Sequence, residues 1–350
     1  MLEEIRQQPV SLERTLSSGL RAAARLRKEL ELRRPKLIVL AARGTSDNAA
    51  QFGRYLLEIA TGIPVSLAAP SILTLYGSSV DLKDALVVAV SQSGESTDTN
   101  LVLERARERG ALNLGITNES SSTLARMADH VWLVRAGKEK SVAATKTYTG
   151  QVLMFYLLAY ALGAKIRVDE LRRLPEWADA ALSTGAAVRE LVGRYRFMSR
   201  TVVVGRGLNY ANALEFGLKL METCYVMAER FSSADFLHGP IAVVEASVPV
   251  FLFAPPGVTW PSIREMSMKL RQRKAEALIV TDASNREAAS AGERVISVPM
   301  KLARKSSLPE EIYTPIPYII PAQMFAAMLA EEKGLDPDRP RALTKVTKTL

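Results

Sequence analysis

Short apolar runs alternate with helical patterns along most of the chain. Runs of strand length stand at residues 36–42, 65–69, 85–90, 112–116 and 130–134. Helical spacing of apolar residues follows several of these runs, and the runs are apolar at successive positions rather than at every second one. Strands that are buried on both faces have this pattern, and they occur in parallel sheets covered by helices. The pattern therefore predicts an α/β fold.

The second half of the chain repeats the first at an offset of 164 residues. Pairs at this offset are Phe52 with Phe216, Glu58 with Glu222, Thr117 with Thr281, and the strand at 131–134 with the strand at 295–298 (216 − 52, 222 − 58, 281 − 117). A single offset over about eighty residues predicts two tandem copies of one α/β unit. The predicted division is a helical segment at 1–34, a first domain at 35–164, a helical connector at 165–198, a second domain at 199–335 and a tail at 336–350.

One hydroxyl-rich loop, residues 91–97, stands between a predicted strand and a predicted helix. It reads Ser-Gln-Ser-Gly-Glu-Ser-Thr, so four hydroxyls and an amide fall within seven residues. The first N–H groups of a helix have no partner inside the helix and attract anions. A simple helix cap needs one hydroxyl and leaves the others unexplained. The loop therefore predicts a phosphate site, although it lacks the Gly-Lys-Ser/Thr of a P-loop.

The two copies differ at this loop. Pro255 stands at the offset position of Ser91 and begins Pro-Pro-Gly, so the second copy has lost the hydroxyls. We expect the second copy to contribute other chemistry. Ligands of open parallel sheets bind at the carboxyl ends of the strands, where Thr45, Ser46 and Thr117 also fall.

Three residues in the second half could take part in catalysis, and each also has an ordinary structural interpretation. Glu222 lies three residues after Lys219 on a predicted helix, so it is either half of a common ion pair or a general base beside a cation. His238 precedes Gly-Pro and is predicted to lie on a turn, where catalytic residues are frequent. Lys345, in the tail, is either a solvated charge or an amine able to form a Schiff base. The loop at 140–147, rich in small and hydroxyl residues, suits close approach to a polyol.

Composition excludes several classes of protein. The 350 residues are 48% hydrophobic and 24% charged, as in a globular protein with a sizeable core, and no apolar run approaches the roughly 20 residues of a membrane span. The acidic N-terminus lacks the pattern of a signal peptide. A single cysteine, Cys224, excludes a disulfide framework, and two histidines do not predict a metal centre. We expect a cytoplasmic protein without a bound metal.

The formal net charge of +9 raises the question of a nucleic-acid partner. The basic residues are interspersed with acidic ones, as between residues 21 and 34, and they form no stripe with aromatic residues. We therefore expect neither nucleic-acid nor membrane binding.

Six motifs in order resemble the double-SIS (sugar isomerase) family, in particular the isomerase domain of glutamine–fructose-6-phosphate aminotransferase. The resemblance covers nearly the whole chain and implies two tandem SIS domains, each a three-layer αβα sandwich around a mainly parallel, flavodoxin-like sheet. The motifs are residues 43–46, 91–96, 143–146, 218–222, 238–240 and 341–345.

The resemblance also implies roles for individual residues. Glu222 would move protons between sugar C1 and C2, and His238 would assist ring opening from the neighbouring subunit of a homodimer. Lys345 would lie over the site on the tail and contact the open-chain sugar or form an imine with it. The sugar phosphate would be held by Ser46, Ser91, Gln92, Ser93 and Ser96, and the pocket would be lined by Thr45, Val142 and Lys219. The ring opening and proton transfer that the resemblance implies require no cofactor.

Two departures from the aminotransferase pattern bear on the reaction. Residues 1–35 leave no room for a glutaminase domain before the first predicted strand, so we expect no glutamine hydrolysis. Arg43 replaces a family cysteine and Leu237 a family lysine. The forms at 42–48 and 232–240 resemble stand-alone glucosamine-6-phosphate deaminases of the SIS type. The expected reaction converts glucosamine 6-phosphate and water to fructose 6-phosphate and ammonia.

Three alternatives to this reaction stay open. The substrate could be fructosamine 6-phosphate or galactosamine 6-phosphate, because the same base and loop would serve. The chain could run the reaction in reverse as an ammonia-dependent synthase. It could also be a sugar-phosphate sensor without activity, although the joint presence of Glu222, His238 and Lys345 argues against that. The sequence does not decide the physiological direction, the effectors, or whether Lys345 forms an imine.

Overall fold

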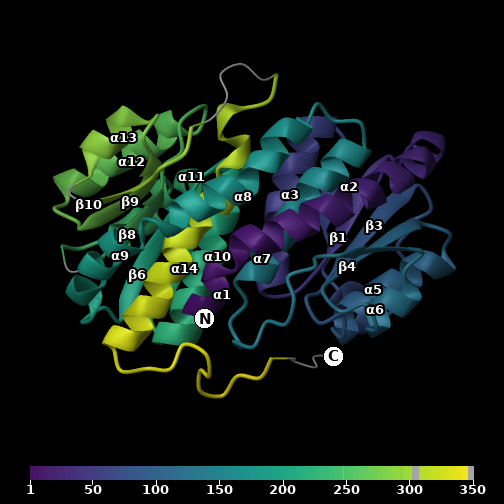
Figure 1. Cartoon of the computed structure of the whole chain (residues 1–350), viewed down its shortest axis with the longest axis horizontal. Coiled ribbons are helices and arrows are strands. Elements are labelled where there is room, and N and C mark those ends of the chain that lie inside the picture. Colours follow the sequence, from purple (N-terminus) through teal and green to yellow (C-terminus); the bar gives the residue numbers. More distant parts are fainter. Residues whose placement is uncertain (247, 293, 302–306, 346–350) are drawn as a thin grey trace. The chain divides into compact units, whose positions relative to one another are not determined.

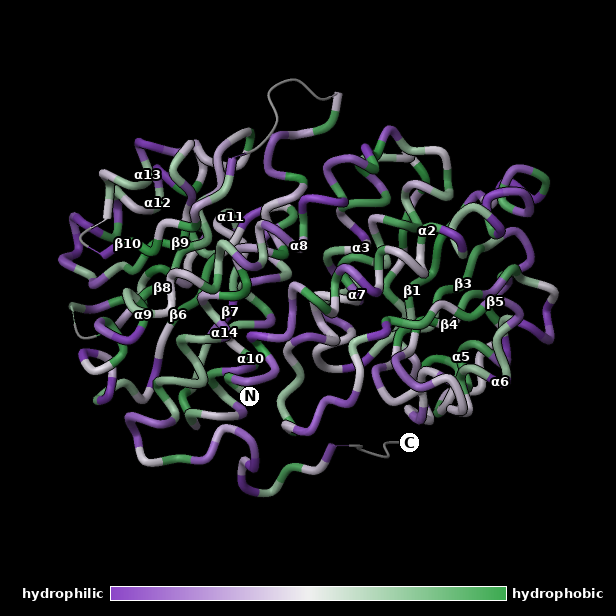
Figure 2. The backbone as a smooth tube through the Cα atoms, viewed as in Figure 1, coloured by the Kyte–Doolittle hydropathy of each residue, from purple (hydrophilic) through white to green (hydrophobic). Residues whose placement is uncertain are grey.

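The computed structural model of the chain (Figure 1) describes residues 1–246, 248–292, 294–301 and 307–345. Apolar residues are concentrated along the strands, and many of the loops and helix turns between them are hydrophilic (Figure 2). Within the described residues, no helix combines the length and the apolar character needed to span a membrane.

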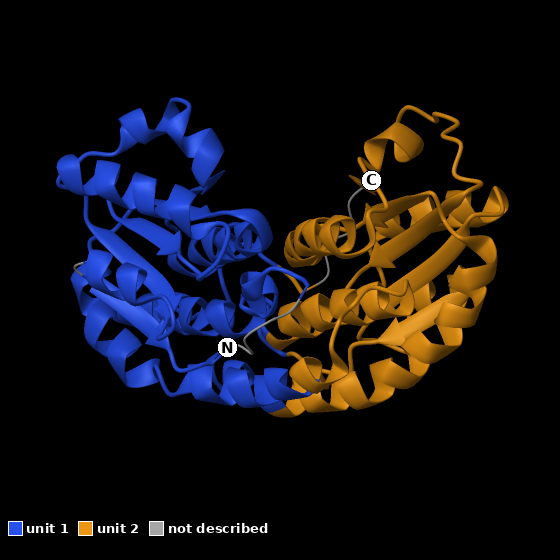
Figure 3. Ribbon diagram, turned by 90° about the horizontal axis from the view of Figure 1, so that it is seen from above, with its two compact units in different colours: residues 1–9, 140–145, 172–343 blue, residues 10–139, 146–171, 344–350 orange. Residues whose placement is uncertain are grey.

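The chain forms two compact units (Figure 3), which are described separately. Unit 1 comprises Met1–Pro9, Lys140–Thr145 and Arg172–Leu343; unit 2 comprises Val10–Glu139, Lys146–Leu171 and Thr344–Leu350, of which Thr344 and Lys345 lie in the described part. The chain therefore passes between the units five times, at 9/10, 139/140, 145/146, 171/172 and 343/344.

Unit 2 contains the predicted first sheet, and its five strands are all parallel in the order β2-β1-β3-β4-β5. In register, Leu37 of β1 pairs with Ala85 of β3, and Leu86 of β3 pairs with Leu112 of β4. The strands are β1 (Leu37–Ala41), β2 (Val65–Leu67), β3 (Ala85–Val90), β4 (Leu112–Thr117) and β5 (His130–Leu133). Each matches a predicted strand to within two residues at either end.

Helices cover this sheet. Val102 and Ala106 of α5 pack against Val39 and Val87 of β1 and β3, and α3 packs against α7. Nearly every residue of α7 is buried, which explains why its sequence shows no polar face. The helices are α2 (Gln8–Arg33), α3 (Thr45–Thr61), α4 (Ser71–Thr74), α5 (Thr97–Glu108), α6 (Thr123–Met127), α7 (Lys146–Ala161) and α8 (Val168–Leu182), with parts of α2 and α8 in unit 1.

Unit 1 repeats this plan. Its sheet order, β10-β9-β8-β6-β7, is the order of the first sheet read from the other edge, and α10 packs on α14 as α3 packs on α7. The predicted duplication of one α/β plan is confirmed. The strands are β6 (Arg200–Gly205), β7 (Met227–Ser232), β8 (Val250–Phe253), β9 (Ala277–Asp282) and β10 (Arg294–Val298).

The helices of unit 1 include the start of the chain. The predicted N-terminal helix is divided into α1 (Leu2–Arg6) and α2, and the predicted connector contains α8, α9 (Gly185–Val192) and the 3₁₀ turn η1 (Gly193–Tyr195). The remaining helices are α10 (Tyr210–Cys224), α11 (Ser233–Leu237), α12 (Trp260–Gln272), α13 (Arg286–Ala291) and α14 (Pro315–Glu332), with 3₁₀ turns η2 (Gly207–Asn209), η3 (Pro240–Val243) and η4 (Glu310–Tyr313).

Candidate functional site

The predicted site residues divide between the two units. Thr45, Ser46, Lys345 and the loop at 91–97 belong to unit 2. Val142, Lys219, Glu222 and His238 belong to unit 1. Each group has its own geometry.

The loop at 91–97 joins the end of β3 to the start of α5, as the sequence predicts. The Gly94 N–H donates to the Ser91 hydroxyl oxygen at 3.1 Å, and the Glu95 N–H donates to the Ser93 hydroxyl oxygen at 3.3 Å. Each of these hydroxyls thus accepts a bond from the loop backbone and keeps its own hydrogen for donation to a ligand. The loop therefore has the donors that an anion requires.

Neighbouring segments hold this loop in shape. The Gln92 carbonyl accepts from the Asn118 N–H at 3.1 Å, and the Gly94 carbonyl accepts from the Asn100 amide at 3.1 Å. Ser96 and Thr99 share a hydroxyl–hydroxyl bond of 3.0 Å at the start of α5. Gly94 has a φ of +68°, in the left-handed region that favours glycine. The loop is thus preorganised by bonds within itself, with the segment that follows β4 and with α5.

Arg43 and Asp98 form an ion pair beside the loop. The Arg43 Nη2 lies 2.5 Å from the Asp98 Oδ2, and Asp98, in the first turn of α5, is 3% exposed. The pair joins the end of β1 to the helix of the candidate phosphate loop. No sequence pattern indicates it, because the two residues are 55 positions apart.

Thr45 and Ser46 begin α3 directly after Gly44, whose φ is +56°. The buried Ser46 hydroxyl accepts a bond of 2.9 Å from the Gln151 amide on α7. Gln151 is thereby a further residue of this group. Its signal in the sequence is weak, because it stands between the polar first residues of α7 and the apolar remainder of that helix.

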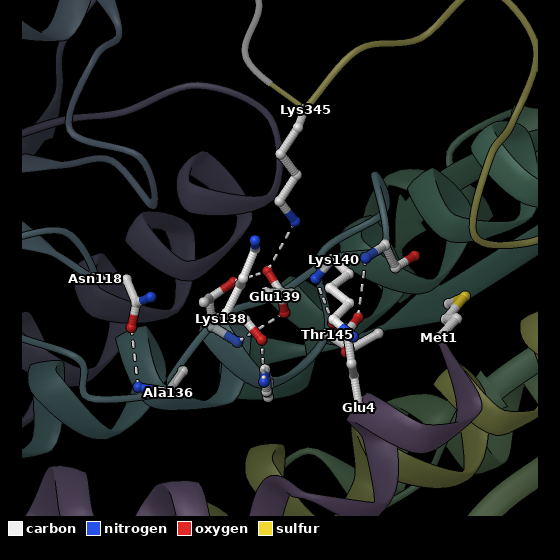
Figure 4. A network of polar contacts seen from close by, with 12 residues as sticks. Met1, Glu4, Asn118, Ala136, Lys138, Glu139, Lys140, Thr145 and Lys345 are labelled. Carbon is white, nitrogen blue, oxygen red and sulfur yellow. Dashed lines mark hydrogen bonds and ion pairs between the residues drawn. The ribbon is translucent and has the colours of Figure 1, made fainter.

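The amine of Lys345 points at the carboxylate of Glu139 (Figure 4) and lies 3.1 Å from its Oε2. The Glu139 side chain is wholly buried and also accepts from the N–H and the hydroxyl of Thr147, at 3.2 and 2.7 Å. The tail lysine is therefore an ordered ion-pair partner with a side chain that is 26% exposed, rather than a solvated charge. Glu139 directly precedes the loop at 140–147, and no sequence pattern indicates its role.

In unit 1, Lys219 lies between two carboxylates on α10. Its Nζ is 2.5 Å from the Glu222 Oε2 and 3.4 Å from the Glu215 Oε1, and the Lys219 and Glu215 side chains are fully buried. Burial alone would lower the pKa of the Lys219 ammonium, but Glu215 and Glu222 outweigh burial and raise it. Lys219 is therefore charged and holds the carboxylate of Glu222, whose side chain is 23% exposed, in one orientation.

His238 lies between α11 and η3, followed by Gly239, so the predicted turn is confirmed. Its side chain is exposed and forms no hydrogen bond with any residue that the structure describes. Val142 lies in the loop at 140–145, where its N–H donates to the Asp338 carbonyl at 3.2 Å. Cys224 is buried, and burial raises the pKa of its thiol to about 11, which is unsuited to a nucleophilic cysteine.

Comparison with known proteins identifies the architecture. The sequence model of the SIS domain matches the chain twice, over residues 31–161 and 198–330. Glutamine–fructose-6-phosphate aminotransferase [isomerizing] of Pyrococcus horikoshii is 34% identical over 99% of this chain. The chain spans 57% of the length of that protein.

Two solved structures share the fold. The C-terminal domain of glucosamine-fructose-6-phosphate aminotransferase from Francisella tularensis superposes with a TM-score of 0.86 at 26% identity, over 97% of this chain and 98% of that one. Glucosamine-6-phosphate deaminase from Thermotoga maritima superposes with a TM-score of 0.78 at 20% identity, over 99% of both chains.

Proposed function

The chain belongs to the SIS domain family, and from this premise we propose that it is an amino-sugar-phosphate deaminase. The proposed reaction converts glucosamine 6-phosphate and water to fructose 6-phosphate and ammonia. The related aminotransferase carries isomerisation in its name, and the fold is shared with a named deaminase. The single cysteine of these 350 residues is buried, so they supply no thiolate for glutamine hydrolysis.

The observation that carries the proposal is the arrangement of Glu215, Lys219 and Glu222. A fully buried ammonium that contacts a partly exposed carboxylate holds that carboxylate in one orientation, as a general base must be held. In the corresponding position of the first copy, Glu58 accepts a bond from the Val65 N–H at 2.9 Å and is a structural residue. The two copies have therefore diverged at this position.

The proposed mechanism uses residues of the chain as proton carriers. His238 assists opening of the sugar ring, and Glu222 removes the proton from C2 and returns it to C1. The amine nitrogen loses a proton as the C2–N bond becomes C=N, and O1 gains a proton as the C=O bond at C1 becomes C–OH. The aldose amine thus becomes a ketose imine without net gain or loss of protons or electrons. Water adds to C2, and ammonia leaves.

The phosphate loop and the tail lysine complete the proposal. The donors of Ser46, Ser91, Gln92, Ser93 and Ser96 hold the phosphate, and Thr45, Val142 and Lys219 line the pocket. Lys345 contacts the open-chain sugar after leaving Glu139, or forms an imine with it. Borohydride trapping of a Lys345 adduct would distinguish these two roles.

The test of the reaction is ammonia release from glucosamine 6-phosphate, with fructosamine 6-phosphate and galactosamine 6-phosphate in parallel. Release from the first sugar is expected. Release from another sugar alone would keep the mechanism and change the substrate. Saturable binding of fructose 6-phosphate without release, and without proton exchange at C1 or C2, would make the chain a sensor rather than an enzyme.

The variant Glu222→Gln tests the base. It is expected to lower kcat by about 10²–10⁴-fold, because an amide cannot accept the C2 proton. Glu58→Gln is the matched control, since it changes the same side chain at the same repeat position and its remaining carbonyl can still accept from Val65. Near-normal turnover of Glu222→Gln would remove Glu222 from the mechanism.

The reverse direction is a second candidate, favoured by the 34% identity to a protein named as a fructose-6-phosphate aminotransferase. Fructose 6-phosphate and ammonium would then give glucosamine 6-phosphate through the same proton transfer. The ratio of the initial rates in the two directions, at fixed substrate concentrations, distinguishes a deaminase from an ammonia-dependent synthase.

A further inference from the structure

The loop after β8 has the place in the second copy that the candidate phosphate loop has in the first. The offset of 164 maps Ser91 to Pro255 and Thr97 to Pro261 (255 − 91, 261 − 97). The structure agrees, because the loop follows β8 and precedes α12, as the first loop follows β3 and precedes α5. The second copy thus keeps the strand–loop–helix frame although it lacks the hydroxyls.

The carboxylate of Glu311 lies in this loop. Its Oε2 accepts from the Thr259 N–H at 3.4 Å. A Cβ built on Gly257 would lie 2.5 Å from the same oxygen, and a Cβ built on Gly207 would lie 3.9 Å from the Oε1. Glu311 is 2% exposed. The backbone of the loops after β6 and β8 therefore encloses the carboxylate.

Glu311 is held without an ion pair. Among the residues that the structure describes, no lysine or arginine pairs with it, and the other charge that acts on it is Glu310. Burial raises the pKa of the Glu311 carboxyl, and bonds from Thr259 and from the Val258 N–H oppose that rise. A buried carboxylate usually requires a partner, and here the N–H groups before α12 take that part.

The backbone of Glu311 is fixed by its own neighbours. Its carbonyl accepts from the Thr314 hydroxyl at 2.8 Å, and that hydroxyl accepts from the Asn209 amide at 2.8 Å. At the offset position the first copy carries Thr147 (311 − 147 = 164), a neutral side chain that bonds to Glu139. The carboxylate is therefore a feature of the second copy.

We propose that the loop after β8 is a second anion-binding loop, and that its ligand is the chain's own Glu311 carboxylate. The comparison of the two copies rests on the phosphate role proposed for the first loop, but not on the reaction. The second loop is closed to external anions while Glu311 fills it. Each chain then binds one sugar phosphate, although it carries two copies of the binding frame.

Removal of the carboxylate should open the second loop to a free one. In Glu311→Ala, sodium formate is expected to raise the Tm saturably by about 2–4 °C over the same concentration of sodium chloride, because a ligand that binds the native state stabilises it. The wild-type protein and Glu310→Ala, which loses an exposed carboxylate one residue away, should show no such difference. Folding of Glu311→Ala in formate but not in chloride would support the proposal equally.

A folded Glu311→Ala that responds alike to both salts would overturn the proposal, as would an equal formate effect on the wild-type protein. If Glu311→Ala folds in neither salt, Gly257→Ala decides, because its Cβ displaces the carboxylate. Gly163→Ala is its control, with a positive φ of +86° and open space around the Cβ. Gly257→Ala should lower the Tm further than Gly163→Ala, and an equal loss would also overturn the proposal. Neither measurement depends on turnover, so the proposed deaminase reaction can fail independently.

Discussion

At the scale of single residues, Lys219 links stability to the proposed chemistry. Lys219→Met is expected to lower the free energy of unfolding by about 3–5 kcal/mol, because it leaves the fully buried Glu215 carboxylate without its cation. Urea unfolding monitored by circular dichroism measures the loss. The same variant should lose turnover, since Glu222 would no longer be held.

Lys269→Met is the control for this prediction. Lys269 pairs with Glu265 one helical turn away, but both side chains are about half exposed, so the loss should stay within about 0.5 kcal/mol. The wild-type pKa of Lys219 is raised above its usual 10.5, so its contribution to stability is complete below pH 10.5 and is lost at more alkaline pH. Equal stability losses in Lys219→Met and Lys269→Met would contradict this account.

The sequence allowed ion pairs to be predicted where the two partners lie within one helical turn of each other. Lys219 and Glu222 are three positions apart on one helix, and Glu215 carries the same signal four positions before Lys219. Arg43 with Asp98 and Glu139 with Lys345 could not be found in this way, because 55 and 206 positions separate the partners and only the folded chain joins them.

At the scale of elements, the candidate phosphate loop depends on Gly94. A Cβ at this position would lie 2.1 Å from the Ser122 hydroxyl oxygen, and the φ of +68° is unfavourable for other residues. Gly94→Ala should weaken fructose 6-phosphate binding and lower the free energy of unfolding by about 1–3 kcal/mol beyond the cost of φ alone. Isothermal titration and urea unfolding measure the two effects.

The control for Gly94→Ala is Gly110→Ala. Gly110 has a similar φ of +73°, but a Cβ there would meet nothing within 4 Å. This variant therefore reports the backbone cost and should leave binding unchanged. Unaltered binding by Gly94→Ala would mean that the shape of the loop does not determine its affinity.

Strands and turns were predictable where consecutive residues share an apolar pattern or carry typical turn residues. The strand at 85–90 is apolar at every position and is found with the predicted bounds. The ends of helices were less predictable: α7 begins at Lys146, within the segment at 140–147 that is predicted to be a loop. Its first residues are polar but buried, and their bonds to Glu139 and Ser46 depend on tertiary structure.

At the scale of the whole molecule, the exposed His238 bears on the homodimer that the family resemblance implies. If His238 completes the site of a neighbouring subunit, each of the inactive variants Glu222→Gln and His238→Ala retains what the other lacks. Mixing the two under conditions that exchange subunits should restore about a quarter of the wild-type activity, because half of the dimers are hybrids with one intact site each. Ammonia release after mixing measures this.

Two outcomes would contradict a shared site. Mixed variants that stay inactive although labelled subunits exchange would place His238 in the site of its own chain. Sedimentation of fully active wild-type protein as a monomer would remove the need for a partner. Glu58→Gln mixed with His238→Ala is the control. It should give about half of the wild-type activity with or without subunit exchange, because each intact His238 completes one site in either arrangement.

The five passages of the chain between its units have a consequence for how the gene can be divided. In unit 1, the N-terminal Gln8 bonds to Gln323 of α14 at 2.8 Å, and Gln323 bonds in turn to the Thr145 carbonyl at 3.3 Å. A fragment ending at residue 164 would carry both ends of this network without its centre. The duplication is therefore still recognisable as a tandem repeat in the sequence. A single cut nevertheless cannot divide the chain into its two compact units, because each unit is built from separated segments of the chain.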